Sequence, residues 1–208
     1  MPKPAKIIIP AEDHHAVLSL LILVRHGESE ANVNYVFTHD LEGFPLTEKG
    51  RGEAGNAARI ISGLGISRIF CSPVLRTRQT AEYISKETGK KVIIDQLLTE
   101  TYMGKMNGVA LKLKLSDMPV GKREEMQIEA WESHVERAAR FMAKLDHDGR
   151  ERIVAVTHGF IIKSFVGAFL GLPEESIYGV NIATGSITVL DLGNRRIHAI
   201  GTYDLRRF

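Results

Sequence analysis

The stretch Leu20-Leu21-Ile22-Leu23-Val24-Arg25-His26-Gly27 decides the fold class of this protein. Five apolar residues end abruptly in a cation, an imidazole and a glycine. A short apolar run bounded by glycine is typical of a buried strand. Arg25 and His26 would then lie at the carboxyl end of that strand, the edge at which open α/β sheets bind ligands. Gly27 lets the backbone come close to a bound group.

A second apolar run ends in the same way. Ile153-Val154-Ala155-Val156 is followed by Thr157-His158-Gly159. If both strands are parallel in one sheet, His26 and His158 lie at the same edge, because parallel strands place their carboxyl ends together. The repeated pattern therefore predicts one site that contains both imidazoles.

A helix is expected to bring an arginine to this edge. Ser72-Pro73 follows an apolar strand, which predicts a helix with Ser72 as N-cap and Pro73 in the first position. Arg76 would then lie in the first turn, where free N–H groups favour an anion. A planar guanidinium can hold two phosphate oxygens at once. Arg25, Arg76 and the two imidazoles together predict a phosphate site.

Strands and helices alternate along the chain, which predicts an α/β fold with a largely parallel sheet and one or two antiparallel strands at an edge. Apolar runs predict strands at 20–24, 66–71, 92–94 and 153–156, and a closing hairpin of 186–192 and 197–203. Helical spacing predicts helices over 53–61 (capped by Thr47), 75–84, 124–145 and 160–170. One domain over 1–208 is expected, with 1–18 as a peripheral extension that carries an edge strand near 6–9.

Composition excludes several classes of partner. With 44% hydrophobic and 25% charged residues the chain is typical of a soluble globular protein, and a net charge of +2 gives no support to a nucleic-acid partner. No apolar run approaches the roughly 20 residues of a membrane span, and the apolar stretch 7–9 is too short for a signal peptide. Cys71 is the one cysteine, so no intrachain disulfide can form. We therefore expect a cytoplasmic protein.

Five pieces of the chain, in order, resemble the histidine phosphatase superfamily, the phosphoglycerate mutase-like proteins. They are Arg25-His26-Gly27-Glu28-Ser29 with Asn32, Pro45-Leu46-Thr47-Glu48-Lys49-Gly50, the run 71–81 around Arg76, Glu100 with Gly104 and Gly108, and Thr157-His158-Gly159. The resemblance covers roughly residues 20–192. It implies a three-layer sandwich, with a mostly parallel central sheet and helices on both faces.

The resemblance also implies roles for the residues of the site. His26 would be the nucleophile that becomes phosphohistidine. Glu100 would protonate the departing oxygen and then take a proton from water. The phosphate oxygens would be held by cations and N–H groups, from Arg25, Asn32, Arg76, His158 and the amide of Gly159. No metal is implied, because fixed cations supply the positive charge.

A second group of residues is placed less firmly. Thr38, Arg78 and Lys112 are candidates for binding the rest of the substrate. Lys122 and Arg123 are also candidates at the mouth of the site, although a solvated basic face is the preferred explanation for Lys112, Lys122 and Arg123. The sequence leaves the oligomeric state open, a homodimer included.

Three functions follow from the resemblance. The first is a metal-independent phosphatase that acts on a small phosphorylated metabolite without a cofactor. The second is a phosphoglycerate mutase, which would need 2,3-bisphosphoglycerate. A mutase must exclude water with a large lid, and the segment from Glu100 to Glu124 is short for one, so the phosphatase is preferred. The third, an inactive phosphoryl-binding protein, is disfavoured because the histidines and arginines of the pocket are all present.

Overall fold

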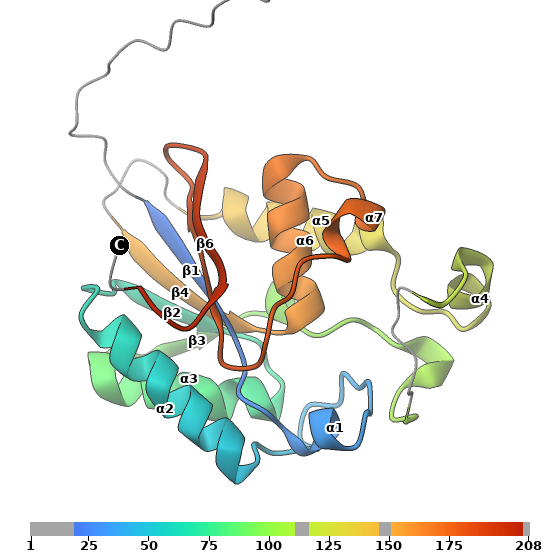
Figure 1. Ribbon diagram of the computed structural model, residues 1–208, viewed down its shortest axis with the longest axis horizontal. Helices are drawn as coiled ribbons and strands as arrows, with labels where there is room; N and C mark the ends of the chain where they lie inside the picture. Colours follow the sequence, from blue (N-terminus) through green and yellow to red (C-terminus); the bar gives the residue numbers. More distant parts are fainter. Residues whose placement is uncertain (1–18, 111–116, 146–150, 206–208) are drawn as a thin grey trace, which may run out of the picture.

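A six-stranded sheet forms the centre of the computed structural model, which describes residues 19–110, 117–145 and 151–205 (Figure 1). In sheet order the strands are β3 (Val92–Ile94), β2 (Arg68–Cys71), β4 (Arg152–Thr157), β1 (Leu20–Arg25), β5 (Ile187–Asp191) and β6 (Arg196–Thr202). Strands β3, β2, β4 and β1 are parallel, and β5 pairs antiparallel with both β1 and β6. The predicted sheet, with its antiparallel strands at one edge, is confirmed.

The register of the central strands brings the two histidines together. Arg25 pairs with Thr157 at the carboxyl ends of β1 and β4, so the next residue on each strand is a histidine. On the other side of β4, Cys71 pairs with Val156, which places Ser72 beside the same edge. Both polar ends therefore emerge at one level of the sheet.

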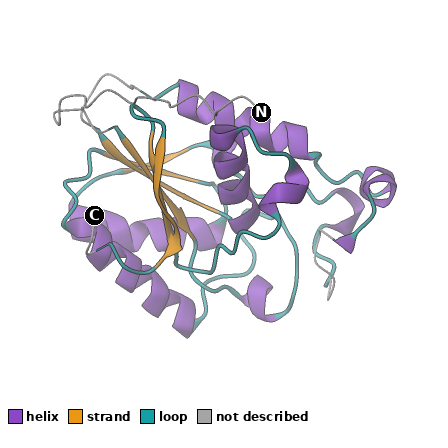
Figure 2. Ribbon diagram, turned by 45° about the horizontal axis from the view of Figure 1, so that its top comes forward, coloured by secondary structure: helices purple, strands orange, loops and turns teal. Residues whose placement is uncertain are grey.

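Side chains of β1 alternate between two apolar layers, as a strand with a period of two requires. Leu20, Ile22 and Val24 pack toward α2 (Glu48–Ser62) and α3 (Leu75–Thr88). Leu21 and Leu23 pack toward α5 (Trp131–Ala143) and α6 (Gly159–Leu170). Each such fully buried side chain stabilises the fold by about 1.5–3 kcal/mol. Figure 2 shows the resulting sheet between two layers of helices, which is the expected three-layer sandwich.

Short elements complete the described chain. They are α1 (Glu30–Val33), the 3-10 turns η1 (Gln96–Leu98) and η2 (Gly104–Met106), α4 (Val120–Glu125) and α7 (Glu174–Ile177). Two predicted helix ends are confirmed. The Thr47 hydroxyl accepts the Gly50 N–H at 3.0 Å at the start of α2, and Gly171 ends α6 with φ +67°.

The single helix predicted over 124–145 is wrong, because the structure has α4 and α5 separated by an irregular segment. Gln127 has φ +59°, which a helix cannot accommodate. The segment bonds to the chain after Glu100 instead: Lys105 donates its N–H to the Met126 carbonyl at 2.9 Å, and Glu129 donates to that of Tyr102 at 2.8 Å. These contacts between distant parts of the chain replace helical hydrogen bonds.

Two expectations concern parts of the chain that lie outside the described residues, namely the edge strand near 6–9 and the extension 1–18. Among the helices of the described residues, none has the length and apolar character needed to cross a membrane.

Candidate active site

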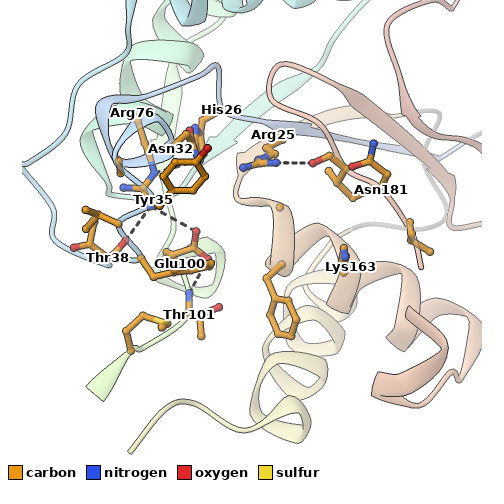
Figure 3. Close-up of a pocket in the computed structure, with 18 of the residues that line it drawn as sticks. Arg25, His26, Asn32, Tyr35, Thr38, Arg76, Glu100, Thr101, Lys163 and Asn181 are labelled. Atoms are coloured by element: carbon orange, nitrogen blue, oxygen red, sulfur yellow. Dashed lines mark hydrogen bonds and ion pairs between the residues drawn. The ribbon is translucent and has the colours of Figure 1, made fainter. Parts of the chain in front are cut away.

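A pocket with a volume of about 690 Å³ opens at the carboxyl edge of the sheet (Figure 3). His26 lines this pocket, and its ring centroid lies 5.2 Å from that of His158, with the two ring planes at 64°. Both histidines are buried. The structure therefore confirms that the ends of the two strands bring His26 and His158 together.

A backbone carbonyl orients the His26 ring. Nδ1 lies 2.7 Å from the Gly27 carbonyl oxygen, so it carries the proton and donates, which leaves a lone pair on Nε2. The turn requires a glycine, because a Cβ at Gly27 would lie 2.1 Å from the Gly50 carbonyl oxygen. The close contact between Gly27 and the first turn of α2 thus sets the direction in which Nε2 points.

His158 is oriented by a residue whose role the sequence pattern misassigned. Its Nε2 lies 2.9 Å from the Ser72 hydroxyl, and its Nδ1 faces Glu100 Oε2 at 3.3 Å. Ser72 was predicted to cap α3, but that helix begins at Leu75 with Val74 as N-cap. Pro73 accordingly precedes the helix by two residues rather than occupying its first position. The Ser72 side chain is used for His158 because β2 and β4 are neighbours, which the local sequence does not reveal.

Arg76 lies between the two histidines. Its Nε donates to His26 Nε2 at 3.2 Å, and its Nη2 lies 3.3 Å from His158 Nδ1. Nη2 also donates to the Thr38 carbonyl oxygen at 2.9 Å. The remaining nitrogen, Nη1, is buried and has no hydrogen-bond partner among the described residues. A buried donor of this kind calls for an oxygen from a ligand.

Arg25 supplies the second guanidinium. Its Nη1 donates to the Ile182 carbonyl oxygen at 2.6 Å, and its buried Nε has no partner within the described part of the chain. A Cβ at Gly159 would lie 3.2 Å from this Nε, so glycine leaves the guanidinium room at the start of α6. Two arginines thus present N–H groups to one small volume.

The electrostatics of the pocket keep both imidazoles neutral. The pKa of His26 lies well below its ordinary value because the ring is buried and because Arg76 and Arg25 repel a proton. The pKa of His158 is lowered in the same direction, first by burial and then by Arg76. A neutral His26 keeps its Nε2 lone pair available for attack, and a bound dianion would compensate the two guanidiniums.

Glu100 and Asn32 complete the set of predicted residues around the two rings. The Glu100 carboxylate lies 3.5 Å from Arg76 Nη2 and accepts the Thr101 N–H at 2.9 Å. The Asn32 side-chain oxygen accepts both the N–H and the hydroxyl of Ser29 at 3.0 Å. Because that oxygen is occupied by donors, the amide nitrogen is the part of Asn32 left for the pocket that it lines.

His26, Glu100 and His158 also form a group with ligand atoms within 4.8 Å of one another, close enough for one metal ion. The neighbouring arginines disfavour this use. Arg76 directs N–H donors at a nitrogen of each ring and adds a positive charge beside the trio. The donor set therefore suits an anion better than a cation.

The second group of predicted residues divides in the structure. Thr38 lines the pocket. Arg78 does not belong to the lining, and its Nη2 donates to Glu42 at 2.6 Å. Lys112 lies outside the described residues. Arg123 is paired with Glu174, with Nη1 donating at 2.5 Å, so it connects α4 to α7. Lys122 pairs with Glu125 within α4.

Sequence patterns missed several residues of the pocket wall. Lys163 lies one turn of α6 after Gly159, so it points to the same side of the helix and lines the pocket. Tyr35 also lines it and has φ +56°, which is unusual for a bulky side chain. The spacing of four residues between Gly159 and Lys163 could have predicted that Lys163 lines the pocket. The sequence offers no comparable pattern for the backbone conformation of Tyr35.

Comparisons with known proteins agree with this site. A model of the histidine phosphatase superfamily (branch 1) matches residues 21–204. The 2,3-bisphosphoglycerate-dependent phosphoglycerate mutase of Thermoplasma acidophilum is 33% identical over 194 residues, which cover 90% of this chain and 94% of that protein. A probable phosphoglycerate mutase of Photorhabdus laumondii is 30% identical and covers 81% of this chain and 83% of its own.

Solved structures with the same architecture include phosphatases. A mycobacterial glucosyl-3-phosphoglycerate phosphatase superposes with a TM-score of 0.73 at 25% identity, over 86% of this chain and 97% of that one. A phosphoserine phosphatase of Entamoeba histolytica gives 0.75 at 20% identity, over 88% and 96%, a likeness of fold. The relatives support an enzyme with phosphatase or phosphoglycerate mutase activity. By the family match and by its relatives, this chain belongs to the histidine phosphatase superfamily.

Proposed function

We propose that this protein is a metal-independent phosphomonoesterase that cleaves a small phosphorylated metabolite through a phosphohistidine at His26. One observation carries the proposal: Arg76 Nη1 and Arg25 Nε are buried donors that find no partner in the described part of the chain, and they lie beside a neutral imidazole. A phosphoryl group placed there would satisfy both donors and meet the Nε2 lone pair of His26.

In the first step, His26 Nε2 attacks phosphorus and the bond between phosphorus and the ester oxygen breaks. The electron pair goes to the leaving oxygen, which takes a proton from Glu100. The charge on the phosphoryl oxygens is stabilised by Arg25, Arg76 and His158, whose Nδ1 lies 3.3 Å from both Arg76 Nη2 and Glu100 Oε2. The Ile182 and Thr38 carbonyls hold the two guanidiniums beside the site, and Arg76 gives up its contact with His26 Nε2 as that nitrogen attacks.

In the second step, water attacks the phosphorus of phosphohistidine. Glu100, now ionised, takes a proton from this water, the bond between phosphorus and nitrogen breaks, and its electron pair returns to Nε2. Inorganic phosphate leaves. The Glu100 side chain is 17% exposed, so water can reach it, whereas the His158 side chain beside it is wholly buried. This access supports hydrolysis.

The stability of a covalent phosphoryl label in acid and in alkali tests the proposal. Incubation with a radiolabelled phosphomonoester and rapid denaturation should trap label that is lost in acid and kept in alkali. His26→Ala should abolish both the label and turnover. His198→Ala, which removes a histidine of β6 that lies 3.5 Å from Asp191, is the matched control and should retain both. Turnover by His26→Ala would show that another group is the nucleophile.

A phosphoglycerate mutase is the second candidate, favoured by the activity named for the Thermoplasma acidophilum relative. Lys163 and Asn181 line the wall of the pocket and could hold a second acidic group of a glycerate. Incubation with 3-phosphoglycerate and 2,3-bisphosphoglycerate separates the two functions. We expect release of free phosphate. Rapid formation of 2-phosphoglycerate without free phosphate would establish the mutase instead.

A further inference from the structure

Glu100 occupies an irregular segment between η1 and η2, with no helix or strand to hold it. A proton donor must keep its geometry to within about 0.5 Å to be effective. The neighbouring Thr101 N–H is the one backbone donor that the described structure gives to its carboxylate. Something outside the segment must therefore fix the path of the backbone on both sides of Glu100.

Arg137 of α5 fixes the side that precedes Glu100. Its Nη1 donates to the carbonyl oxygens of Leu97 at 3.1 Å and Thr99 at 2.8 Å. Its other nitrogens, Nε and Nη2, form a bidentate pair with Glu129, both at 2.8 Å. The guanidinium is thereby locked in one plane, and its remaining donor is aimed at the residues before Glu100.

Glu129 and His134 fix the side that follows Glu100. The Glu129 carboxylate accepts the Tyr102 N–H at 3.0 Å, while the Glu129 N–H donates to the Tyr102 carbonyl at 2.8 Å. His134 Nδ1 donates to the Ala130 carbonyl at 2.8 Å, so Nε2 accepts the Thr101 hydroxyl at 3.1 Å. The His134 side chain is fully buried and its Nε2 also lies 3.3 Å from Glu129 Oε2. Burial lowers the pKa of His134, while Glu129 acts in the opposite direction.

These contacts flank the proposed proton donor. Arg137, His134 and Glu129 together form hydrogen bonds to four residues around Glu100, namely Leu97, Thr99, Thr101 and Tyr102. The Arg137–Glu129 ion pair is partly buried, with side chains 17% and 12% exposed. Such a pair is a costly way to pack a helix, because apolar residues of the same volume would stabilise as well or better. Unlike an apolar contact, the ion pair can also hold backbone N–H and carbonyl groups in a fixed direction.

We infer that Arg137, with Glu129 and His134, is a positioning group that holds Glu100 where it can protonate the leaving oxygen. The inference rests on the proposed role of Glu100 as the proton donor. The three residues themselves do not line the pocket and need not touch substrate. Their effect should therefore appear in the step that needs a proton, and only there.

A pair of aryl phosphates isolates that step. p-Nitrophenolate is a weak base and leaves without a proton, whereas phenolate is a stronger base and needs one. The readout is the ratio of single-turnover rates of phosphohistidine formation from p-nitrophenyl phosphate and phenyl phosphate. The two esters share the phosphoryl group and the ring and differ only in the nitro group, so a general loss of fold or affinity lowers both rates and cancels in the ratio.

Arg137→Ala should raise this ratio by about 10- to 100-fold, because general acids contribute on that scale or more. Arg137→Lys keeps the charge but not the planar fork, so it should restore only part of the wild-type ratio. Arg140→Ala is the matched control on α5, since its side chain is exposed and lies 4.0 Å from Glu136 on the same helix. It should leave the ratio unchanged.

Glu129→Gln keeps the volume and serves if Arg137→Ala does not fold; it should raise the ratio in the same direction. Equal loss of both rates in these variants, with the ratio unchanged, would reduce the cluster to a structural role and overturn the inference. Glu100→Ala separates the two claims. If Glu100→Ala itself leaves the ratio unchanged, the proposed proton donor is wrong and the inference falls with it.

Discussion

Nε of Arg76 lies 3.2 Å from Nε2 of His26, so the nitrogen proposed as nucleophile is held by a cation until a phosphate arrives. Burial lowers the pKa of His26 most, and this contact adds to the effect because a second positive charge beside the guanidinium is costly. The same guanidinium has a free buried donor in Nη1 among the described residues. When substrate binds, Arg76 can therefore give up its hydrogen bond to His26 and form hydrogen bonds to the phosphate oxygens instead.

Replacing Arg76 should remove transition-state stabilisation while leaving the fold intact. We expect Arg76→Ala to lower kcat/KM by about 10²- to 10³-fold, the usual effect of losing a donor to a charged transition state. Arg76→Lys should recover little, because one ammonium cannot reach both histidines and the phosphate. Steady-state kinetics measure this. Arg78→Ala, two residues along α3 and paired with Glu42, is the control and should behave as wild type. Comparable losses in both variants would contradict the assignment.

Stability should fall as the solution becomes acidic. His26, His158 and His134 are buried, and each has a pKa below its ordinary value. Unfolding lets them regain protons below a pH of about 6.5, so the free energy of unfolding should decrease by up to about 1.4 kcal/mol per pH unit for each ring. Urea titrations at several pH values measure how the free energy of unfolding changes with pH. Above this range, that change should be close to zero. His134→Gln should reduce by one the number of protons taken up on unfolding, so the free energy of unfolding should depend less steeply on pH. An unchanged dependence would show that His134 is charged in the folded protein.

The turn after His26 should tolerate no side chain at Gly27. A Cβ there would overlap the Gly50 carbonyl oxygen, which belongs to the backbone of α2 and cannot move alone. We expect Gly27→Ala to destabilise by about 1–3 kcal/mol or more. Gly52→Ala provides the contrast, because its Cβ meets nothing within 4 Å. It should stabilise α2 by up to about 1 kcal/mol. Thermal unfolding of both variants decides the point, and an equal change in the two would refute the steric argument.

Cys71 should be chemically silent in the folded protein. Burial at the end of β2 raises the pKa of its thiol to about 12, so almost no thiolate exists near neutral pH. Native protein should react with an aromatic disulfide reagent only as fast as it unfolds, and denaturant should release one thiol per chain. Fast reaction of the native thiol would show that the carboxyl edge of β2 opens in solution.

The layout of the sheet and the main chemistry of the site could be read from local patterns. Apolar runs that end in His-Gly locate strands and place each histidine at a carboxyl edge, because strand periodicity and glycine turns are properties of a few adjacent residues. That is why His26, His158 and Arg76 were predicted correctly to converge. The family resemblance added Glu100 and Asn32, which no periodicity singles out.

Contacts between distant segments decided the rest. Ser72 has the chemistry of a helix cap, yet it bonds to His158 because β4 lies beside β2. The helix expected through Gln127 is broken because Glu129 and Arg137 bond to the segment around Glu100. A side chain with several satisfactory partners takes the one that the packed sheet brings near, and only the tertiary structure determines which that is.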